Sequence, residues 1–346
     1  MNQKTLKQVA GIDVAQDELV VSLGRMYGDL STEIYSHRVF ANTAKGFCEL
    51  ADWANKQTDP AVGLQFVMEA TGVYHESLAY FLADSGYNLS IVVPNKISNY
   101  MRTLATKTIT DKTASQAIAR FGMERKLENW KRPSKTFKQL RQLTRERDQI
   151  VGLRTMAKNH LHAEQAEAEP NAGSVARIKK QILFFTKQEA EIRSALQELI
   201  KLNEELKAAV KRSCSIPGVG VLTAATVLGE TNGFDLIRNK KQLTSYAGLD
   251  VQEKQSGTSV KGKARISKKG NKYLRKCLHM PALTSIRTDE RSKAIFVRIV
   301  SRHGIKMKAV VAIQRKLLEM IYTLHKQQTT YDPDYLKKIE SSYAAP

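Results

Sequence analysis

Three acidic residues lie at the ends of apolar segments, where they could support metal-dependent chemistry on phosphates. Asp13 lies inside the apolar run 9–14, Glu69 follows the apolar run 63–68, and Asp111 begins a helical stretch. A carboxylate inside an apolar strand needs a partner or a cation. Acids at the ends of neighbouring strands and a helix are how oxygen-ligated Mg²⁺ sites are built. Such ions clamp phosphoryl oxygens and activate an attacking oxygen.

Each acid also has an ordinary explanation when it is taken alone. Asp13 could cap a turn, Glu69 could end its strand in solvent, and Asp111 could be the N-cap of a helix. Taken together, in this order of strands and helix, the three acids favour the metal site.

A second group of candidates occupies a small polar loop and the basic tract that comes after it. The loop carries the hydroxyls of Ser256, Thr258 and Ser259, and a serine hydroxyl needs a base or a metal to become a good nucleophile. A dense cationic tract would hold a phosphodiester and stabilise the charge that develops on transfer. Its members are Lys261, Lys263, Arg265, Lys268, Lys269, Lys272, Arg275 and Lys276. These residue types do not choose among the three hydroxyls, and a solvated DNA-binding loop without chemistry explains the tract equally well.

The glycine-rich segment 215–225 is similar to a helix-hairpin-helix turn. Gly218 and Gly220 would let the turn approach a nucleic-acid backbone closely. The free N–H groups of the next helix favour phosphate. We therefore interpret the segment as a sequence-independent nucleic-acid contact. The alternative is a tight turn between helices whose glycines serve packing.

These candidates need a scaffold, and the first 130 residues predict one of mixed strands and helices. Strands are expected at 9–14, 18–23, 34–40, 63–68 and 89–94, and helices at 75–85 and 111–126. Antiparallel strands first, then alternating strands and helices, is the order of an RNase H-like α/β domain.

The rest of the chain predicts helices only. From residue 136 to 211 apolar residues recur at helical spacing, with a loop near 169–173. This pattern predicts two long antiparallel helices or a dimerising coiled coil. A helical linker with a charged, solvated face is the alternative. From Ser213 onward the chain is helical and very basic.

The charge balance points to a polyanionic partner. The sequence has 55 Lys and Arg against 34 Asp and Glu, a net charge of +21. Nucleic acid is the leading partner, because neutralised phosphates release counterions, and an anionic membrane surface is the second. No apolar run approaches the roughly 20 residues that span a bilayer, and the polar start lacks a secretory core. Three distant cysteines predict neither a disulfide framework nor a zinc site, and they fit a reducing cytoplasm.

Seven short motifs run along nearly the whole chain in a recognisable order and spacing. They are Gly11-Ile12-Asp13-Val14, Phe40-Ala41-Asn42-Thr43 with Lys45-Gly46, Met68-Glu69-Ala70-Thr71-Gly72-Val73-Tyr74, Thr110-Asp111-Lys112, Ile216-Pro217-Gly218-Val219-Gly220, Tyr246-Ala247-Gly248-Leu249, and Ser256-Gly257-Thr258-Ser259-Val260-Lys261-Gly262. Together they resemble the DEDD transposases of bacterial insertion sequences, which include Piv-type DNA invertases and bridge-RNA-guided recombinases.

The resemblance implies a site made by two domains. It implies that Asp13, Glu69 and Asp111 hold Mg²⁺ and that Ser256 is the nucleophile, which would form a covalent phosphoserine–DNA intermediate. The implied domains are a RuvC-like metal-binding domain (1–130), a coiled-coil connector (131–212), a carboxy-terminal transposase domain with a helix-hairpin-helix (213–335) and a tail (336–346).

The resemblance also implies partners and a location. We expect donor and target DNA, a structured guide RNA from the flanking non-coding region, and a homodimer or homotetramer whose domains meet across subunits. We expect no membrane partner and a bacterial cytoplasmic protein that works at the nucleoid.

One position departs from the family pattern. The fourth acid of the family lies three residues after the third, on the same helix face, and here that position is Ala114. Ala114 cannot ligate a metal. Ser115 or Gln116 would have to supply an oxygen, directly or through water, and Asp17 is a weaker alternative.

Two other functions remain open at this point. A metal-dependent nuclease, like a Holliday-junction resolvase, would use the acids with water as the nucleophile. A non-catalytic nucleic-acid-binding relative would use the basic surface alone, and Ala114 is compatible with it.

Overall fold

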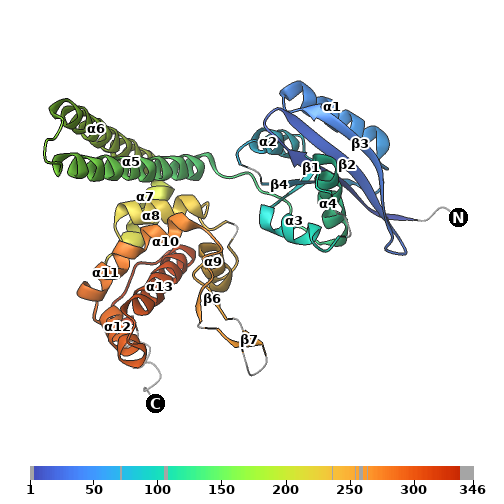
Figure 1. Ribbon diagram of the computed structural model, residues 1–346. Coiled ribbons are helices and arrows are strands. Elements are labelled where there is room, and N and C mark those ends of the chain that lie inside the picture. The colour runs from blue at the N-terminus through green and yellow to red at the C-terminus, as the bar shows by residue number, and fades with distance from the viewer. Residues whose placement is uncertain are drawn as a thin grey trace, which may run out of the picture. The chain divides into compact units, whose positions relative to one another are not determined.

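The chain divides between Arg132 and Pro133 into an amino-terminal unit and a carboxy-terminal unit, each with its own core. The computed structural model describes residues 4–70, 72–104, 108–235, 237–253, 255–256, 260–262 and 264–335 (Figure 1). The division lies close to the boundary that the sequence predicts at residue 130.

The amino-terminal unit is built on a five-stranded mixed sheet. Its strands are β1 (Thr5–Val14), β2 (Glu18–Tyr27), β3 (Thr32–Ala41), β4 (Leu64–Glu69) and β5 (Asn88–Val92). They lie in the order β3-β2-β1-β4-β5. Strands β1, β2 and β3 pair antiparallel, while β4 pairs parallel with both β1 and β5. This order and these directions confirm the RNase H-like α/β fold.

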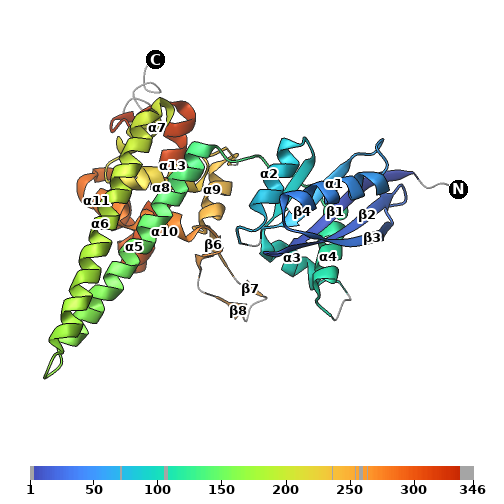
Figure 2. The same cartoon turned by 90° about the horizontal axis from the view of Figure 1, so that it is seen from above.

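Helices cover both faces of this sheet, and strand alternation decides which residues meet which helices. Helices α1 (Ala44–Gln57) and α2 (Glu76–Asp84) pack on the face that includes Ile12 and Met68. Helices α3 (Pro94–Met101) and α4 (Asp111–Glu124) pack on the face that includes Val9 and Val67 (Figures 1 and 2). Asp13 and Glu69 have the parity of Val9 and Val67, so both belong to the α4 face.

Helix α4 lies unusually close to the sheet because glycine removes the side chains between them. A Cβ added to Gly11 would lie 2.3 Å from the backbone nitrogen of Ala119, and one added to Gly122 would lie 2.8 Å from Val9. The hydroxyls of Ser22 on β2 and Ser115 on α4 meet at 2.8 Å in the buried layer between them. These contacts fix the start of α4 beside the end of β1.

The carboxy-terminal unit begins with a helical hairpin. Helices α5 (Lys135–Gln165) and α6 (Ala172–Leu202) lie antiparallel against each other, as Figure 2 shows. This is the pair of long helices that the sequence predicts. Leu140 on α5 and Leu196 and Ile200 on α6 belong to the core of the unit. The hairpin therefore shares one core with the helices after it, although the sequence predicts a domain boundary at residue 212.

The rest of the unit includes the long helix α13 (Lys306–Gln327), whose buried face includes Ile313, Leu317 and Ile321. The other helices are α7 (Glu204–Cys214), α8 (Val221–Glu230), α9 (Lys240–Ala247), α10 (Lys272–Cys277), α11 (His279–Thr288) and α12 (Glu290–His303), and the short strands are β6 (Val251–Gln252), β7 (Gln255–Ser256), β8 (Val260–Lys261) and β9 (Arg265–Ile266). Within the described ranges, no helix is long and apolar enough to cross a membrane.

Candidate active site and nucleic-acid interface

The predicted acids Asp13, Glu69 and Asp111 lie near the carboxyl ends of the inner strands β1 and β4. This end of the sheet is called the acidic edge below. The parallel register pairs Ile12 with Met68, so the next residues, Asp13 and Glu69, are neighbours on adjacent strands. Asp111 is the first residue of α4, on the same face. The N-cap is Thr110, whose hydroxyl accepts from the backbone N–H of Thr113, so Asp111 is not the cap that the alternative explanation required.

The pKa of the Asp13 carboxyl reflects the nearby acids. Burial raises the pKa of its carboxyl from 3.8 to about 6, and the negative charges of Asp111 and then Glu69 add to the rise. Asp13 and Asp111 line a cavity of about 360 Å³, with Gln16, Glu18 and Tyr74 also at its wall. Mutual repulsion of carboxylates at a cavity is the condition that a bound cation relieves.

Oxygen donors of this kind suit a hard divalent cation, although they are not gathered into a ready-made coordination shell. In the part of the chain that the structure describes, no three His, Cys, Asp or Glu side chains lie close enough together to hold a metal ion. The donor chemistry and the raised pKa of Asp13 therefore fit a cation, and binding would have to draw the acids closer together.

The position of the missing fourth acid is also defined. Ala114 is half-buried on α4. Ser115 is fully buried, and its hydroxyl lies 2.8 Å from the Ser22 hydroxyl and 2.9 Å from the Lys112 carbonyl oxygen. This side chain is committed to the contact between helix and sheet, which argues against Ser115 as the replacement oxygen.

Sequence reasoning missed Glu18, which the β1–β2 hairpin returns to the acidic edge. The backbone N–H of Ala15 donates to the Glu18 carbonyl at 2.9 Å, and Asp13 pairs with Val20. Glu18 has the parity of Val20 and lines the cavity with Asp13. The signal in the sequence was a three-residue turn between two apolar runs, which brings an acid on its far side back beside the first.

Asn42, a motif residue without an assigned role, supports the same edge. Its side-chain amide donates to the carbonyl of Ala15 at 2.8 Å and to that of Tyr74 at 3.3 Å. Both acceptors lie in loops that border the cavity. Gly46 of the same motif permits the turn into α1, since a Cβ there would lie 2.0 Å from the Ala41 oxygen.

The candidate nucleophile lies in a small hairpin of the carboxy-terminal unit. Strands β7 and β8 pair antiparallel, with Ser256 opposite Val260. Thr258, Ser259 and Lys263 lie outside the described residues, as do the side chains of Ser256 and Lys261.

The described part of the basic tract is held by the turn at Gly248. The backbone N–H of Lys268 donates to the Gly248 carbonyl at 3.1 Å, and that of Asn271 donates to the Tyr246 carbonyl at 2.8 Å. Gly248 has φ +67°, and a Cβ added to Gly270 would lie 2.5 Å from the backbone nitrogen of Gly248. The turn at Gly248 and the turn at Gly270 therefore contact each other through their backbones. The tract's described cations are thereby gathered on β9, this turn and α10: Arg265, Lys268, Lys269, Lys272, Arg275 and Lys276.

An ion pair that sequence reasoning missed, between the buried Glu230 and the partly exposed Arg145, supports this surface. The Glu230 side chain is 1% exposed and accepts two hydrogen bonds from Arg145, at 2.6 and 2.7 Å. It also accepts one from the Asn271 amide at 2.6 Å. The Tyr246 hydroxyl donates to the Glu230 carbonyl at 2.9 Å. The available signal was an acid directly after the apolar run 221–229, the same argument that identified Asp13.

The glycine hairpin joins α7 to α8, and its two glycines differ. Gly218 has φ +88°, and a Cβ there would lie 2.6 Å from the Pro281 oxygen and 2.9 Å from the Ser285 nitrogen of α11. Protein packing therefore explains Gly218. Gly220 is the exposed N-cap of α8 with open space around it, so it is the glycine that a ligand could approach.

Two family models match this chain. Residues 10–165 match the model of the IS110-type DEDD transposases, which is described as "Transposase". Residues 211–296 match a second model, described as "Transposase IS116/IS110/IS902 family". The two matches cover both the acidic edge of the sheet and the basic tract.

Relatives extend over almost the full length. The pilin gene-inverting protein of Moraxella lacunata is 28% identical over 331 residues, which is 94% of this chain and 98% of that protein. The transposase for insertion sequence element IS1111A of Coxiella burnetii is 24% identical over 94% of this chain and 91% of that protein. The solved structure of Thermus thermophilus RuvC aligns with 36% of this chain and 99% of that chain, at 11% identity and a TM-score of 0.28. The chain belongs to the IS110-type DEDD transposases, a family of DNA recombination enzymes.

Proposed function

We propose that this protein exchanges DNA strands through a covalent phosphoserine intermediate on Ser256, assisted by Mg²⁺ held at Asp13, Glu69 and Asp111. The observation that carries the proposal is that Asp13 of β1 and Asp111 of α4 line one cavity, while Glu69 ends the strand paired with β1. The raised pKa of Asp13, to which the charges of Asp111 and Glu69 contribute, agrees with this arrangement. When bound, Mg²⁺ would supply charge neutralisation at the phosphoryl oxygens.

The transfer step is a transesterification. The Ser256 oxygen forms a bond to phosphorus while the bond from phosphorus to a deoxyribose oxygen breaks, and the serine proton passes through water to the departing oxygen. The reverse reaction with a different deoxyribose hydroxyl releases the serine and joins the new strands. Neither step consumes water or a nucleotide cofactor, so no free ends remain.

The basic surface would position the phosphodiester. Arg265, Lys268, Lys269, Lys272 and Arg275 supply cations on a rigid turn and helix, together with Lys261 and Lys263. The exposed N-terminus of α8 at Gly220 adds N–H donors for phosphate. A net charge of +21 is compatible with holding DNA and a structured guide RNA at once.

Glu18 is our candidate for the fourth oxygen ligand, in place of the absent acid at position 114. It lines the cavity with Asp13 and Asp111, from the hairpin rather than from α4. Its carboxylate is exposed, so it can rotate toward a cation without breaking core contacts.

Assembly into a homodimer or homotetramer would use the hairpin of α5 and α6. Leu183 and Phe184 on α6 and Met156 on α5 are 58–70% exposed. Apolar side chains presented together on a helical pair favour association with another copy. The double variant L183S/F184S should shift the mass measured by light scattering toward the monomer, whereas the exposed polar change K187Q should not.

The nucleophile can be tested with a plasmid that carries the gene together with its own flanking DNA, incubated with protein and Mg²⁺. Labelled DNA that migrates with the protein in a denaturing gel measures the covalent adduct. S256A should abolish the covalent adduct and the recombinant products while retaining DNA binding. The matched loop variant S259A should retain the adduct, the recombinants and DNA binding. Omitting RNA transcribed from the flanking region should abolish recombination.

The other functions give different results. DNA cleavage that persists in S256A without an adduct would identify a water-using nuclease. Cleavage that persists in D13N would reject metal catalysis at the acidic edge. Salt-sensitive binding with neither adduct nor cleavage under any divalent metal would identify a non-catalytic binder.

A further inference from the structure

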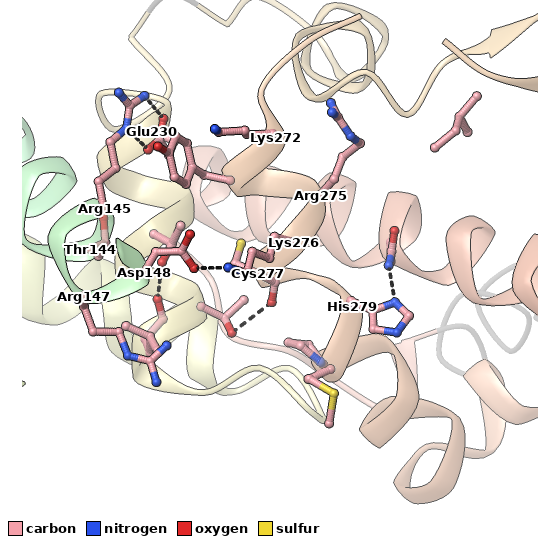
Figure 3. A pocket seen from close by; sticks show the side chains of 18 residues that line it. Thr144, Arg145, Arg147, Asp148, Glu230, Lys272, Arg275, Lys276, Cys277 and His279 are labelled. Carbon is pink, nitrogen blue, oxygen red and sulfur yellow. Dashed lines mark hydrogen bonds and ion pairs between the residues drawn. The ribbon is translucent and has the colours of Figure 1, made fainter. Parts of the chain in front are cut away.

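A pocket of about 710 Å³ opens between α5, α8, α10 and α11 in the carboxy-terminal unit (Figure 3). Its volume lies within the range of small-ligand sites, roughly 300–1,000 Å³. The buried carboxylate of Glu230 lies in its wall with its partner Arg145. The lining residues of the pocket all belong to the carboxy-terminal unit and include members of the basic tract.

Five Lys and Arg side chains and two acidic side chains line the pocket, and three of the cations are paired, including Arg147 with Glu189 at 2.7 Å. Glu230 is paired with Arg145 at 2.6 Å, and Asp148 with Lys276 at 2.5 Å. Lys272 and Arg275 also line the pocket and lie three residues apart on α10, hence on one helix face. Arg275 uses one nitrogen to donate to the Ala247 carbonyl at 2.8 Å, which fixes its guanidinium beside the opening. These two positive side chains are the candidates for contact with an anion at the pocket.

The interior is apolar. Leu222 on α8, Ile266 on β9, and Met280 and Pro281 on α11 line it. The Cys277 thiol also lines it, and burial raises the pKa of this thiol, so the wall is uncharged there at neutral pH.

Two further parts of the pocket wall are an aromatic ring and a pair of polar side chains. The Tyr273 ring is held by Arg145, at 4.6 Å from its centroid, and by Lys272, at 5.2 Å. On another wall, the amide nitrogen of Gln314 lies 3.0 Å from Nδ1 of His279 (Figure 3). The pocket thus combines flat apolar surface, a fixed polar pair and cations at the mouth.

We propose that this pocket receives one unstacked nucleotide of a nucleic-acid strand, with the base inside and the adjoining phosphate on Lys272 and Arg275. A base matches the interior because it is flat, has apolar faces and carries hydrogen-bonding groups at its edge. The phosphate matches Lys272 and Arg275 because it is an anion joined to the base through the sugar. The inference rests on the proposed nucleic-acid binding, and it does not depend on strand exchange.

The alternatives account for less of the pocket. Binding of a duplex backbone needs cations on a surface and would leave the apolar interior unused. A purely apolar ligand would gain nothing from Lys272 and Arg275. An extruded or single-stranded nucleotide uses both parts, and its unstacking is least costly where the strand is unpaired.

Met280 offers a direct test, because it lines the pocket yet its side chain is 65% exposed. M280W should obstruct the pocket without changing charge or core packing, and M280L should keep the pocket open. The probes are a fluorescein-labelled single DNA strand of about 12 nucleotides, the RNA of the same sequence, and the blunt DNA duplex, each titrated with the full-length protein.

We expect M280W to weaken single-strand binding about tenfold, the order of one lost base contact, and to change duplex binding less than about twofold. M280L should bind as the original chain does. K272Q should weaken binding of the single strands and lower the slope of log affinity against log salt by about one. The charge-matched variant K308Q, on an exposed residue of α13 that does not line the pocket, should weaken single-strand binding less than K272Q does.

The possible results separate the pocket from the proposed function. Loss of DNA-strand binding alone, RNA-strand binding alone, or both in M280W supports the pocket and identifies which strand enters it. Unchanged single-strand affinity in M280W overturns the pocket while leaving the proposed function intact, provided the original chain binds DNA. Absence of binding to all three probes by the original chain overturns both.

Discussion

The carboxylates of Asp13 and Asp111 line one cavity, and the negative charge of Asp111 raises the pKa of Asp13. Asp13 lies near the end of the first strand and Asp111 begins α4, so the chain completes nearly the whole sheet before these two groups meet. Two like charges held together by the fold cost stability unless a proton or a cation neutralises them.

The stability of the amino-terminal unit should therefore depend on pH. The folded Asp13 carboxyl keeps its proton up to about pH 6, whereas its usual pKa is 3.8. The folded state binds more protons in this window, so the free energy of unfolding falls as the pH rises from about 4 to about 6. Because Asp13 is partly exposed, we expect the free energy of unfolding to fall by about 1–2 kcal/mol over this pH range.

The comparison is between the original chain and D13N, unfolded by denaturant at pH values on both sides of this window. Trp53 and Trp130 are the two tryptophans of the sequence, and both lie in the amino-terminal unit, so tryptophan fluorescence reports on this unit. In D13N the free energy of unfolding should no longer fall between about pH 4 and about pH 6. At neutral pH this variant should be more stable than the original chain. Equal pH dependence in both proteins would mean that Asp13 titrates normally.

Restoring an acid at position 114 should strengthen metal binding. Ala114 lies three residues after Asp111 on α4, and a carboxylate there adds an oxygen ligand and a negative charge. We expect A114D to bind Mg²⁺ about tenfold more tightly, in line with the dependence of affinity on ligand charge. Without Mg²⁺ the same variant should be less stable, because the added charge repels Asp13 and Asp111.

Calorimetric titration with Mg²⁺ measures that affinity, and E18Q tests the ligand that we propose in its place. A114N is the matched control, since it adds an oxygen without a charge. E18Q should weaken binding in the original chain and should matter less in A114D. Identical Mg²⁺ affinities for E18Q and the original chain would exclude Glu18 as a ligand.

The two glycines of the α7–α8 turn should respond differently to alanine. At Gly218 the added methyl would meet the backbone of α11 in a left-handed conformation, so G218A should cost about 2–4 kcal/mol. G220A has open space and φ −95°, so its stability should change by less than about 0.5 kcal/mol. Thermal unfolding followed by helical circular dichroism provides the comparison, and equal losses would show that the turn does not pack as described.

Breaking the ion pair beneath the basic tract should destabilise the carboxy-terminal unit. E230Q removes the carboxylate that accepts from Arg145 and Asn271; the glutamate side chain is 1% exposed but the arginine side chain is 41% exposed, so we expect a loss of about 1–3 kcal/mol. D148N removes the partner of Lys276, whose side chain is 63% exposed, and should cost less than about 1 kcal/mol. Denaturant unfolding followed by circular dichroism measures both, and a smaller loss for E230Q than for D148N would contradict the buried role of Glu230.

Local pattern was sufficient to predict the sheet and the acids on it. Short apolar runs predicted the strands, and an acid inside or directly after such a run, as at Asp13 and Glu69, predicted the acidic edge. The long helices could be predicted from their spacing of apolar residues in the same way. In these cases the information lies within about ten neighbouring residues.

Contacts between distant segments were not predictable by this reasoning. Arg145 and Glu230 are 85 positions apart, and no local pattern pairs one arginine with one glutamate among so many charges. The packing of Gly218 against Pro281 likewise depends on how α11 folds back. A glycine that serves a neighbouring helix and one that serves a ligand have the same sequence signature, so only the fold separates Gly218 from Gly220.

The pairing of Arg145 with Glu230 also has a mechanical consequence. Arg145 belongs to α5, the helix that runs to the tip of the hairpin, while Glu230 is bound in turn to Asn271, the N-cap of α10. A rotation of the hairpin about its base would displace the guanidinium and, through the shared carboxylate, the start of α10. Arg145 lies 20 residues before the end of α5, so a partner bound at the tip of the hairpin would be joined to Lys272 and Arg275 through one helix and one shared carboxylate.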